Sequence, residues 1–352
     1  MMKHTSAAIL SVLLVLPAFG QEATYGDKVD VNLVLVDATV TDNKGNQILG
    51  LDKNDFIVRE NGVEQKIDSI DYFTNRRLLT GPESAANFKV ERVREERYFI
   101  LFFDKSAPQY SVNSTAPSLL VTSELLRAKE AAIKFVENEL QPNDLVAVTG
   151  FDARLKVYTD FTSNRAKLKE ALNQAITFSV GIKTPSPDTA GPSIMRNLNS
   201  RKMMSKTGRI HDAVTLLSDA LRPIPARKVL VLFTTGVGRT GGTDEAYYRP
   251  MARALNKSNV SVYPINLLRE YRDFPTDSML SRLSSETGGE YSPLAINFDS
   301  PLKRMENESN GYYLLSYYAA DKKKKTRDGY QKIEVSLRNP EFRVKAREGY
   351  AY

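Results

Sequence analysis

The run Tyr98–Phe103 (YFILFF) constrains the fold more than any other stretch, because it is apolar throughout and stops at the carboxylate of Asp104. Such a run is typical of a parallel strand buried on both faces. Similar apolar runs occur later, at Leu145–Phe151, Lys228–Thr235 and Val260–Leu267. Segments with helical periodicity lie between them. The alternation predicts a doubly wound, mostly parallel α/β sheet, with any binding site at the carboxyl ends of its strands.

Helical periodicity is clear in three segments, Ser123–Leu140, Asn164–Ile176 and Arg209–Leu221. Thr162 or Ser163 is expected to cap the second of these helices. Residues 177–208 interrupt the rhythm with prolines and serines. Loops of this length in compact domains are usually functional or disordered.

Both ends of the chain have strand patterns. Val29–Thr41 alternates in a way that predicts a strand with both faces partly covered, and Asn61-Gly62 is a strong hairpin signal. Three more strands are expected near the C-terminus, at Tyr312–Tyr318, Tyr330–Leu337 and Phe342–Ala346. Neither set has enough strands to be stable alone. We therefore predict a discontinuous β-sandwich-like domain, residues 28–77 and 311–352, with the α/β domain, residues 95–307, inserted.

The N-terminus predicts export. Residues 1–20 (MMKHTSAAILSVLLVLPAFG) combine a lysine, an apolar core and small residues at their end, as a cleavable signal peptide does. An uncleaved anchor is the alternative, but the apolar core is about half of the roughly 20 residues that a membrane span needs. No later stretch is long enough. The chain has no cysteine, so we expect a secreted or periplasmic protein without disulfides and without a membrane span after signal cleavage.

The charge pattern disfavours nucleic-acid binding. The formal charge is +7, from 49 basic and 42 acidic residues, and basic residues cluster at Arg196–Arg209 and Lys322–Lys325. Proteins that bind nucleic acids usually have aromatic residues for base stacking among their basic residues, and these clusters lack aromatic residues. We interpret them as solvated loops.

Several motifs together resemble a von Willebrand factor type A domain. They are an Asp-x-Ser strand end at Asp104, the strand after Asp144 (DLVAV), the strand end Leu232–Gly236 (LFTTG) and the turn Thr287–Tyr291. The order of parts is similar to that of exported acidobacterial proteins related to this family. The matching features are the valine-rich strand Val29–Val40, the segment Gly50–Phe56 (GLDKNDF) and the ending Arg347–Tyr350.

The resemblance implies a metal-ion-dependent adhesion site for Mg²⁺ or Mn²⁺, which hydroxyl and carboxylate oxygens hold. Asp104 and Ser106 match its first two positions, and Thr207 lies in the loop that supplies its threonine. These three residues are the candidate metal ligands. The alternative is structural: Asp104 is satisfied by backbone amides and Ser106 caps the loop.

The candidate metal site departs from the family pattern. Pro108 stands at the second serine, Gly208 at the usual threonine position, and Thr235 where the pattern has an aspartate. Asp244 could replace that carboxylate in space. Because these ligands are missing, we predict a degenerate site that holds no metal cofactor. The alternative is that the site still binds Mg²⁺ or Mn²⁺.

No catalytic set stands out. Only two histidines occur, His4 in the signal segment and His211, and there is no cysteine nucleophile. A lone histidine on a helix is usually structural, although a triad using a distant serine is recognised only by geometry. We expect no enzymatic activity.

The leading hypothesis is an exported, non-enzymatic, adhesion-type module that binds a protein or peptide. Its binding loops are expected at Ser106–Ser114, Lys206–Arg209 and Gly236–Asp244, with Lys105, Arg209, Arg239 and Asp244 as candidate contact residues. Their basic balance favours an acidic partner. The alternative is a structural or assembly component of the cell envelope that binds through the β-domain by strand pairing.

Overall fold

The computed structural model describes residues 33–43, 46–74, 96–106, 116–177, 191–198, 208–224, 226–237, 244–268, 274–293, 297–319 and 330–351. Asn32–Tyr352 form one compact unit. The predicted signal peptide lies outside the described residues.

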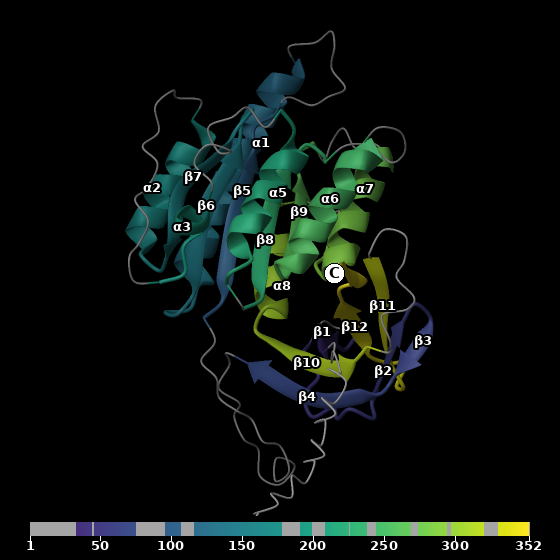
Figure 1. The fold of residues 1–352 in the computed structure, drawn as a ribbon. Coiled ribbons are helices and arrows are strands. Elements are labelled where there is room, and N and C mark those ends of the chain that lie inside the picture. The colour runs from purple at the N-terminus through teal and green to yellow at the C-terminus, as the bar shows by residue number, and fades with distance from the viewer. Residues whose placement is uncertain are drawn as a thin grey trace, which may run out of the picture. The chain divides into compact units, whose positions relative to one another are not determined.

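A five-stranded sheet of order β7-β6-β5-β8-β9 forms the centre of the α/β part (Figure 1). Its parallel strands are the four predicted ones: β5 (Tyr98–Asp104), β6 (Leu145–Phe151), β8 (Lys228–Thr234) and β9 (Val260–Asn266). Every residue of β5, β8 and β9 is buried. The fold-class prediction is confirmed. An antiparallel edge strand that was not predicted, β7 (Leu155–Thr162), completes the sheet.

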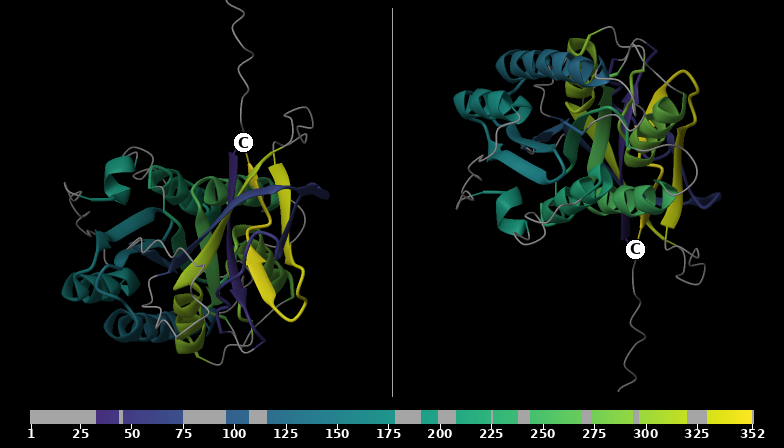
Figure 2. Two further views of the ribbon diagram at one scale, coloured as in Figure 1. Left: turned by 90° about the horizontal axis from the view of Figure 1, so that it is seen from below. Right: turned by 90° about the horizontal axis from the view of Figure 1, so that it is seen from above.

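Helices cover both faces of this sheet, as the two views of Figure 2 show. One face packs against α5 (Ile210–Leu221), α6 (Asp244–Lys257) and α7 (Phe274–Thr287), and the other against α1 (Ala116–Asn138), α2 (Arg165–Ile176) and α8 (Asp299–Glu308). The short helix α3 (Ile194–Asn197) packs on the α5 side. Among the described helices, none is long and apolar enough to span a membrane.

The cap of α2 differs from the prediction. The side chain of Asn164, rather than Thr162 or Ser163, accepts the backbone N–H of Lys167 at 3.1 Å. Asn164 is the residue directly before the first helical turn, where a side-chain oxygen reaches the free N–H groups.

Two antiparallel sheets make up the β part, and each mixes strands from both ends of the chain (Figure 1). The first has the order β12-β1-β10-β4, with β1 (Leu33–Thr41), β4 (Ile67–Thr74), β10 (Gly311–Tyr318) and β12 (Arg343–Ala346). The second has the order β13-β11-β2-β3, with β2 (Phe56–Glu60), β3 (Val63–Gln65), β11 (Tyr330–Leu337) and β13 (Gly349–Ala351). One core joins the sheets. The exact domain boundaries stay a prediction.

The predicted hairpin is present between β2 and β3. Asn61 and Gly62 both have positive φ, 50° and 81°, as a two-residue hairpin turn requires.

Strand β1 is covered on its outer face only in its second half. Val34 and Val36 are buried in the β core, and Thr39 is buried on the opposite face. Leu33 and Leu35, on the same face as Thr39, are 50% and 44% exposed. The expectation that both faces are partly covered therefore holds for Thr39 and not for the start of the strand.

Candidate functional site

The candidate site lies at the carboxyl edge of the parallel sheet. There β5 ends at Asp104, β8 ends at Thr234, and α6 begins at Asp244. Because α5 and α7 run antiparallel to the strands that they precede or follow, their first residues lie at this same edge. Thr207 and Arg239 lie outside the described residues, and nothing is described of the Asp244 side chain.

Asp104 is fully buried, and its carboxylate points into the protein. One oxygen accepts the backbone N–H of Ser106 at 2.9 Å and also the Ser106 hydroxyl. The other oxygen accepts the hydroxyl of Thr234 at 2.7 Å. Burial raises the pKa of Asp104 to about 6, against the opposite effect of these hydrogen bonds. The structure thus brings Asp104 and Ser106 together. Ser106 donates to the Asp104 carboxylate, as expected if the pair stabilises the loop and does not bind a metal ion.

Thr234 is a site residue that sequence reasoning missed. Its hydroxyl bridges Asp104 and the backbone N–H of Gly236, which lies 3.0 Å away. Its role follows from the pairing of β5 with β8, which the sequence alone does not show: Phe103 lies opposite Phe233, so the next residues, Asp104 and Thr234, are also neighbours. Thr234, one residue before the position compared with the family aspartate, is therefore the residue beside Asp104.

The described residues around Asp104 do not by themselves supply the ligands of a Mg²⁺ or Mn²⁺ centre. Such ions need several oxygen ligands, normally with carboxylate charge. Around Asp104 the described residues supply one carboxylate, both of whose oxygens already accept hydrogen bonds. Within the described ranges, no three His, Cys, Asp or Glu side chains gather where they could hold a metal ion.

Lys105 points away from the rim. Its ammonium donates to the Tyr158 hydroxyl at 3.0 Å and the Thr177 carbonyl at 2.9 Å, and it lies 3.4 Å from the Asp152 carboxylate. Burial lowers the pKa of Lys105, partly offset by Asp152. Since side chains alternate along a strand, Lys105 falls on the α2 side and Asp104 on the α5 side. A partner could reach this ammonium only if the cluster opened.

Arg209 is the described candidate that faces solvent. It directly precedes α5, is exposed, and places its guanidinium 3.9 Å from the ring centroid of Tyr247 on α6. Phe274, the first residue of α7, is 83% exposed. Arginine and aromatic side chains are the types most enriched at binding hot spots. We call Arg209, Tyr247 and Phe274 the rim surface.

His211 has a structural place beneath this surface. It is buried, and its Nε2 lies 2.8 Å from the Val237 carbonyl, just beyond the end of β8. Its ring is tilted against Tyr247, with centroids 6.3 Å apart. His211 thus ties the start of α5 to the segment after β8.

No protein-family model and no curated protein matches the sequence. Similar solved structures include an aerotolerance-related membrane protein from Bacteroides fragilis, at 16% identity and a TM-score of 0.40, covering 61% of this chain and 98% of that one. The protein BatB from Bacteroides thetaiotaomicron has 16% identity and a TM-score of 0.39, covering 60% and 96%. A von Willebrand factor type A protein from Catenulispora acidiphila has 11% identity and a TM-score of 0.39, covering 72% and 64%. The narrower acidobacterial resemblance stays a prediction.

Proposed function

We propose that this chain is an exported, non-enzymatic protein-interaction module that binds an acidic protein or peptide at the rim surface. The observation that carries the proposal is the exposed guanidinium of Arg209, stacked on Tyr247 at 3.9 Å. Stacking holds the guanidinium in one place and leaves its edge free to meet a carboxylate. Such a preorganised cation loses little conformational entropy on binding.

Charge around Arg209 supports an acidic partner. The stretch 196–209 has five basic residues and no acidic one: Arg196, Arg201, Lys202, Lys206 and Arg209. Arg239 adds a further positive charge in the loop that follows β8. Opposite charge on the partner would speed association and make it sensitive to salt.

Direct contacts rather than a bridging metal fit the strand ends. The Asp104 carboxylate is turned inward onto Ser106 and Thr234, so the proposal assigns it to holding the loops and not to a cation. His211 is likewise engaged with the Val237 carbonyl. Binding would then persist in chelator.

The test is capture from envelope extract with the full mature chain, followed by affinity measurement with the captured partner at several salt concentrations. We expect the double variant Arg209→Glu, Arg239→Glu to weaken binding at least ~10-fold and to flatten its salt dependence. The matched control is Arg59→Glu with Arg343→Glu, which reverses two charges on β2 and β12. Unchanged affinity in the rim variant would refute the rim as the binding site.

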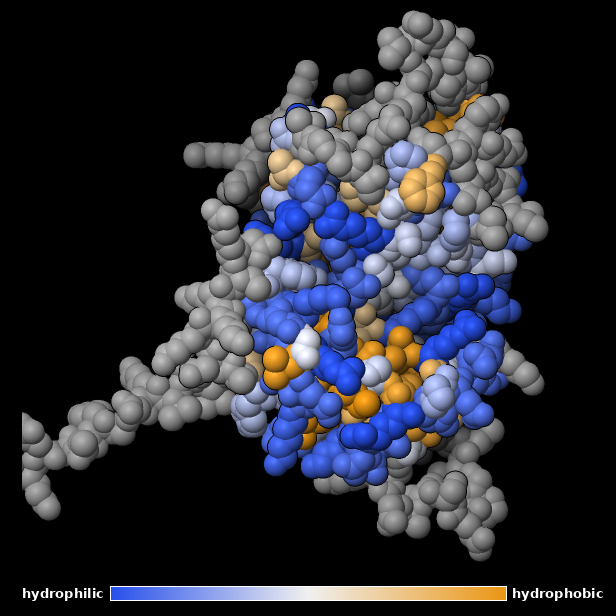
Figure 3. Space-filling model, turned by 90° about the vertical axis from the view of Figure 1, so that its right-hand side faces the viewer, coloured by the Kyte–Doolittle hydropathy of each residue, from blue (hydrophilic) through white to orange (hydrophobic). Residues whose placement is uncertain are grey.

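A second function has its own supporting observation. Leu33 and Tyr318 lie directly opposite each other across β1 and β10, and they are 50% and 52% exposed. Hydrophobic side chains also gather over the β part on the face drawn in Figure 3. An apolar patch of this kind fits an assembly component of the envelope. Loss of capture in Leu33→Ser with Leu35→Ser, and not in the rim variant, would favour this function.

A further inference from the structure

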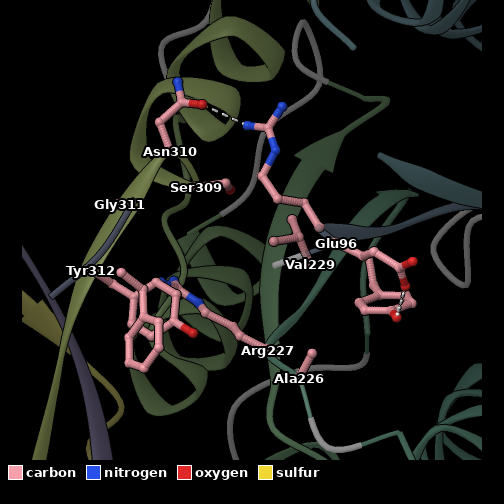
Figure 4. A pocket seen from close by; sticks show the side chains of 11 residues that line it. Glu96, Ala226, Arg227, Val229, Ser309, Asn310, Gly311 and Tyr312 are labelled. Carbon is pink, nitrogen blue, oxygen red and sulfur yellow. Dashed lines mark hydrogen bonds between the residues drawn. The ribbon is translucent and has the colours of Figure 1, made fainter. Parts of the chain in front are cut away.

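The β part occupies the amino edge of the parallel sheet. In the pocket at this edge (Figure 4), Arg97 of the α/β part donates to the side-chain oxygen of Asn310, just before β10, at 2.8 Å. Arg227 likewise donates to the Thr39 hydroxyl on β1 at 3.4 Å. Contacts within the chain thus close this edge, and the rim surface lies at the opposite one.

Phe274 is the most exposed of the large hydrophobic side chains that the structure describes, at 83%. It begins α7, and the ring of Pro275 fixes the backbone of the first turn. Thr276 and Met279 are buried and hold this turn on the protein. An aromatic side chain on a rigid backbone loses little conformational entropy when a partner covers it. Single exposed hydrophobic residues are common on protein surfaces, so the neighbours of Phe274 decide its role.

The residues after β8 touch the first turns of both α5 and α7. A Cβ atom on Gly236 would lie 3.1 Å from the methyl carbon of Thr276 on α7. The carbonyl oxygen of the next residue, Val237, lies 2.8 Å from Nε2 of His211 on α5. Consecutive Cα atoms are only about 3.8 Å apart. The starts of α5 and α7 are therefore close neighbours at this edge.

Arg209 and Phe274 stand at these two helix starts, with Tyr247 of α6 between them. Arg209 lies two residues before His211, and α6 packs against both α5 and α7. Since the axes of packed helices lie about 8–10 Å apart, we place the guanidinium of Arg209 and the ring of Phe274 roughly 10–15 Å apart. An extended peptide advances about 3.3 Å per residue, so roughly three or four positions span this distance.

We infer that the rim surface recognises an extended peptide segment in which an acidic and a large apolar side chain stand roughly three or four positions apart. Arg209, held on the Tyr247 ring, contacts the carboxylate, and Phe274 contacts the apolar side chain. The contact with Phe274 rests on the proposed function, because it is the second contact of the same site. Salt screens the charged contact and leaves the apolar one almost unchanged.

The probes are short peptides of glycine and serine, acetylated and amidated at their ends, that carry one glutamate and one leucine. In the first peptide these two residues have the spacing given above. In the second they are adjacent, and in the third a serine replaces the leucine. Saturation-transfer NMR with the full mature chain measures the affinity of each at several salt concentrations. We expect the first peptide to bind at least ~5-fold more tightly than the other two.

Two variants separate the contacts. Phe274→Ser should remove the ~5-fold advantage of the leucine and leave the salt dependence unchanged. Arg209→Gln should weaken binding of all three peptides and flatten its salt dependence. The matched control is Val63→Ser, at a side chain on β3 that is 57% exposed, and it should change neither quantity.

Equal affinity of the unchanged chain for the first and third peptides would overturn the inference, and this comparison needs no variant. If Arg209→Gln still weakened binding in that case, the proposed function would stand without the apolar contact. Equal affinity for the first and second peptides would overturn the spacing. A chain that bound the captured partner through Arg209 but bound none of the peptides at millimolar concentration would also overturn the inference and leave the proposed function intact.

Discussion

The Thr234 hydroxyl lies 2.7 Å from the Asp104 carboxylate and donates to it, which joins the ends of two neighbouring parallel strands. Ser106 donates to the same carboxylate from the other side. Both carboxylate oxygens are thus used inside the protein, and the side chain has no exposed surface. The Asp104 carboxylate therefore holds the ends of β5 and β8 together through hydrogen bonds from Ser106 and Thr234.

The burial of Asp104 predicts that the effect of Asp104→Asn on the free energy of unfolding depends on pH. Burial raises the pKa of Asp104 from 3.8 to about 6 in the folded chain, so the protonated form is the one that folding favours. Its stabilisation is complete below about pH 4 and is lost as the pH rises through 6. Asparagine stays neutral at every pH. The free energy of unfolding of the variant, relative to that of the unchanged chain, should therefore rise by roughly 3 kcal/mol between pH 4 and 7. Urea unfolding at several pH values measures this difference, and an equal change in the exposed control Asp68→Asn would contradict it.

We expect Mg²⁺ and Mn²⁺ to leave the melting temperature unchanged. A site with a Kd of ~10 μM would add ~2.7 kcal/mol at ~1 mM metal, enough to raise the melting temperature by a few degrees. Calorimetry with metal and with chelator measures the shift. A rise that Asp104→Ala abolishes would show that Asp104 takes part in binding a metal ion, against this prediction.

Gly289→Ala should destabilise the chain strongly. A Cβ atom there would lie 1.9 Å from the backbone oxygen of Val262 on β9, and backbone cannot move aside cheaply. We expect a loss of about 3 kcal/mol or more in the free energy of unfolding. Gly191→Ala is the matched control, because its Cβ would meet nothing within 4 Å. Similar losses in both variants would mean that close packing on β9 is not the cause.

Deleting Gly311–Tyr352 should unfold the N-terminal strands. The deletion removes β10 and β12, both partners of β1, and β11, a partner of β2. Limited proteolysis with mass spectrometry would then show rapid cleavage within residues 33–74. Residues 98–308 retain the whole parallel sheet and serve as the internal control. Protection of residues 33–74 in the truncated chain would contradict the prediction.

Apolar runs were sufficient to predict the central sheet, because four of its strands are buried on both faces. Strand β7 was missed because Lys156 and Thr159 interrupt its apolar residues, as happens on an edge strand. Helix α8 was missed because only Leu302 and Met305 are its buried apolar residues. Short amphipathic and edge elements have patterns too weak to separate from loops.

The sequence was sufficient to predict that Asp104 and Ser106 lie at a strand end, but not which side chains they contact. Asp104 and Ser106 lie together at the strand end, yet the role of Thr234 depends on which strand is the neighbour of β5. The direction of Lys105 could have been predicted from alternation alone, since adjacent strand residues face opposite sides. The expectations for Thr207 and Arg239 stay predictions.

The pairing of β1 with β10 and β12 has a consequence for the order of folding. The Leu51 N–H donates to the Tyr313 hydroxyl across 262 residues of chain, and Glu60 accepts hydroxyls from Tyr317 and Tyr350. During synthesis, β1 and β4 therefore leave the ribosome long before β10, the strand that lies between them, has been made. The parallel sheet can form meanwhile from residues closer in sequence, and closing such a long loop is slow. The edges of β1 and β4 thus stay unpaired while the α/β part is made, and any factor that protects the nascent chain from aggregation must act on them until β10 follows.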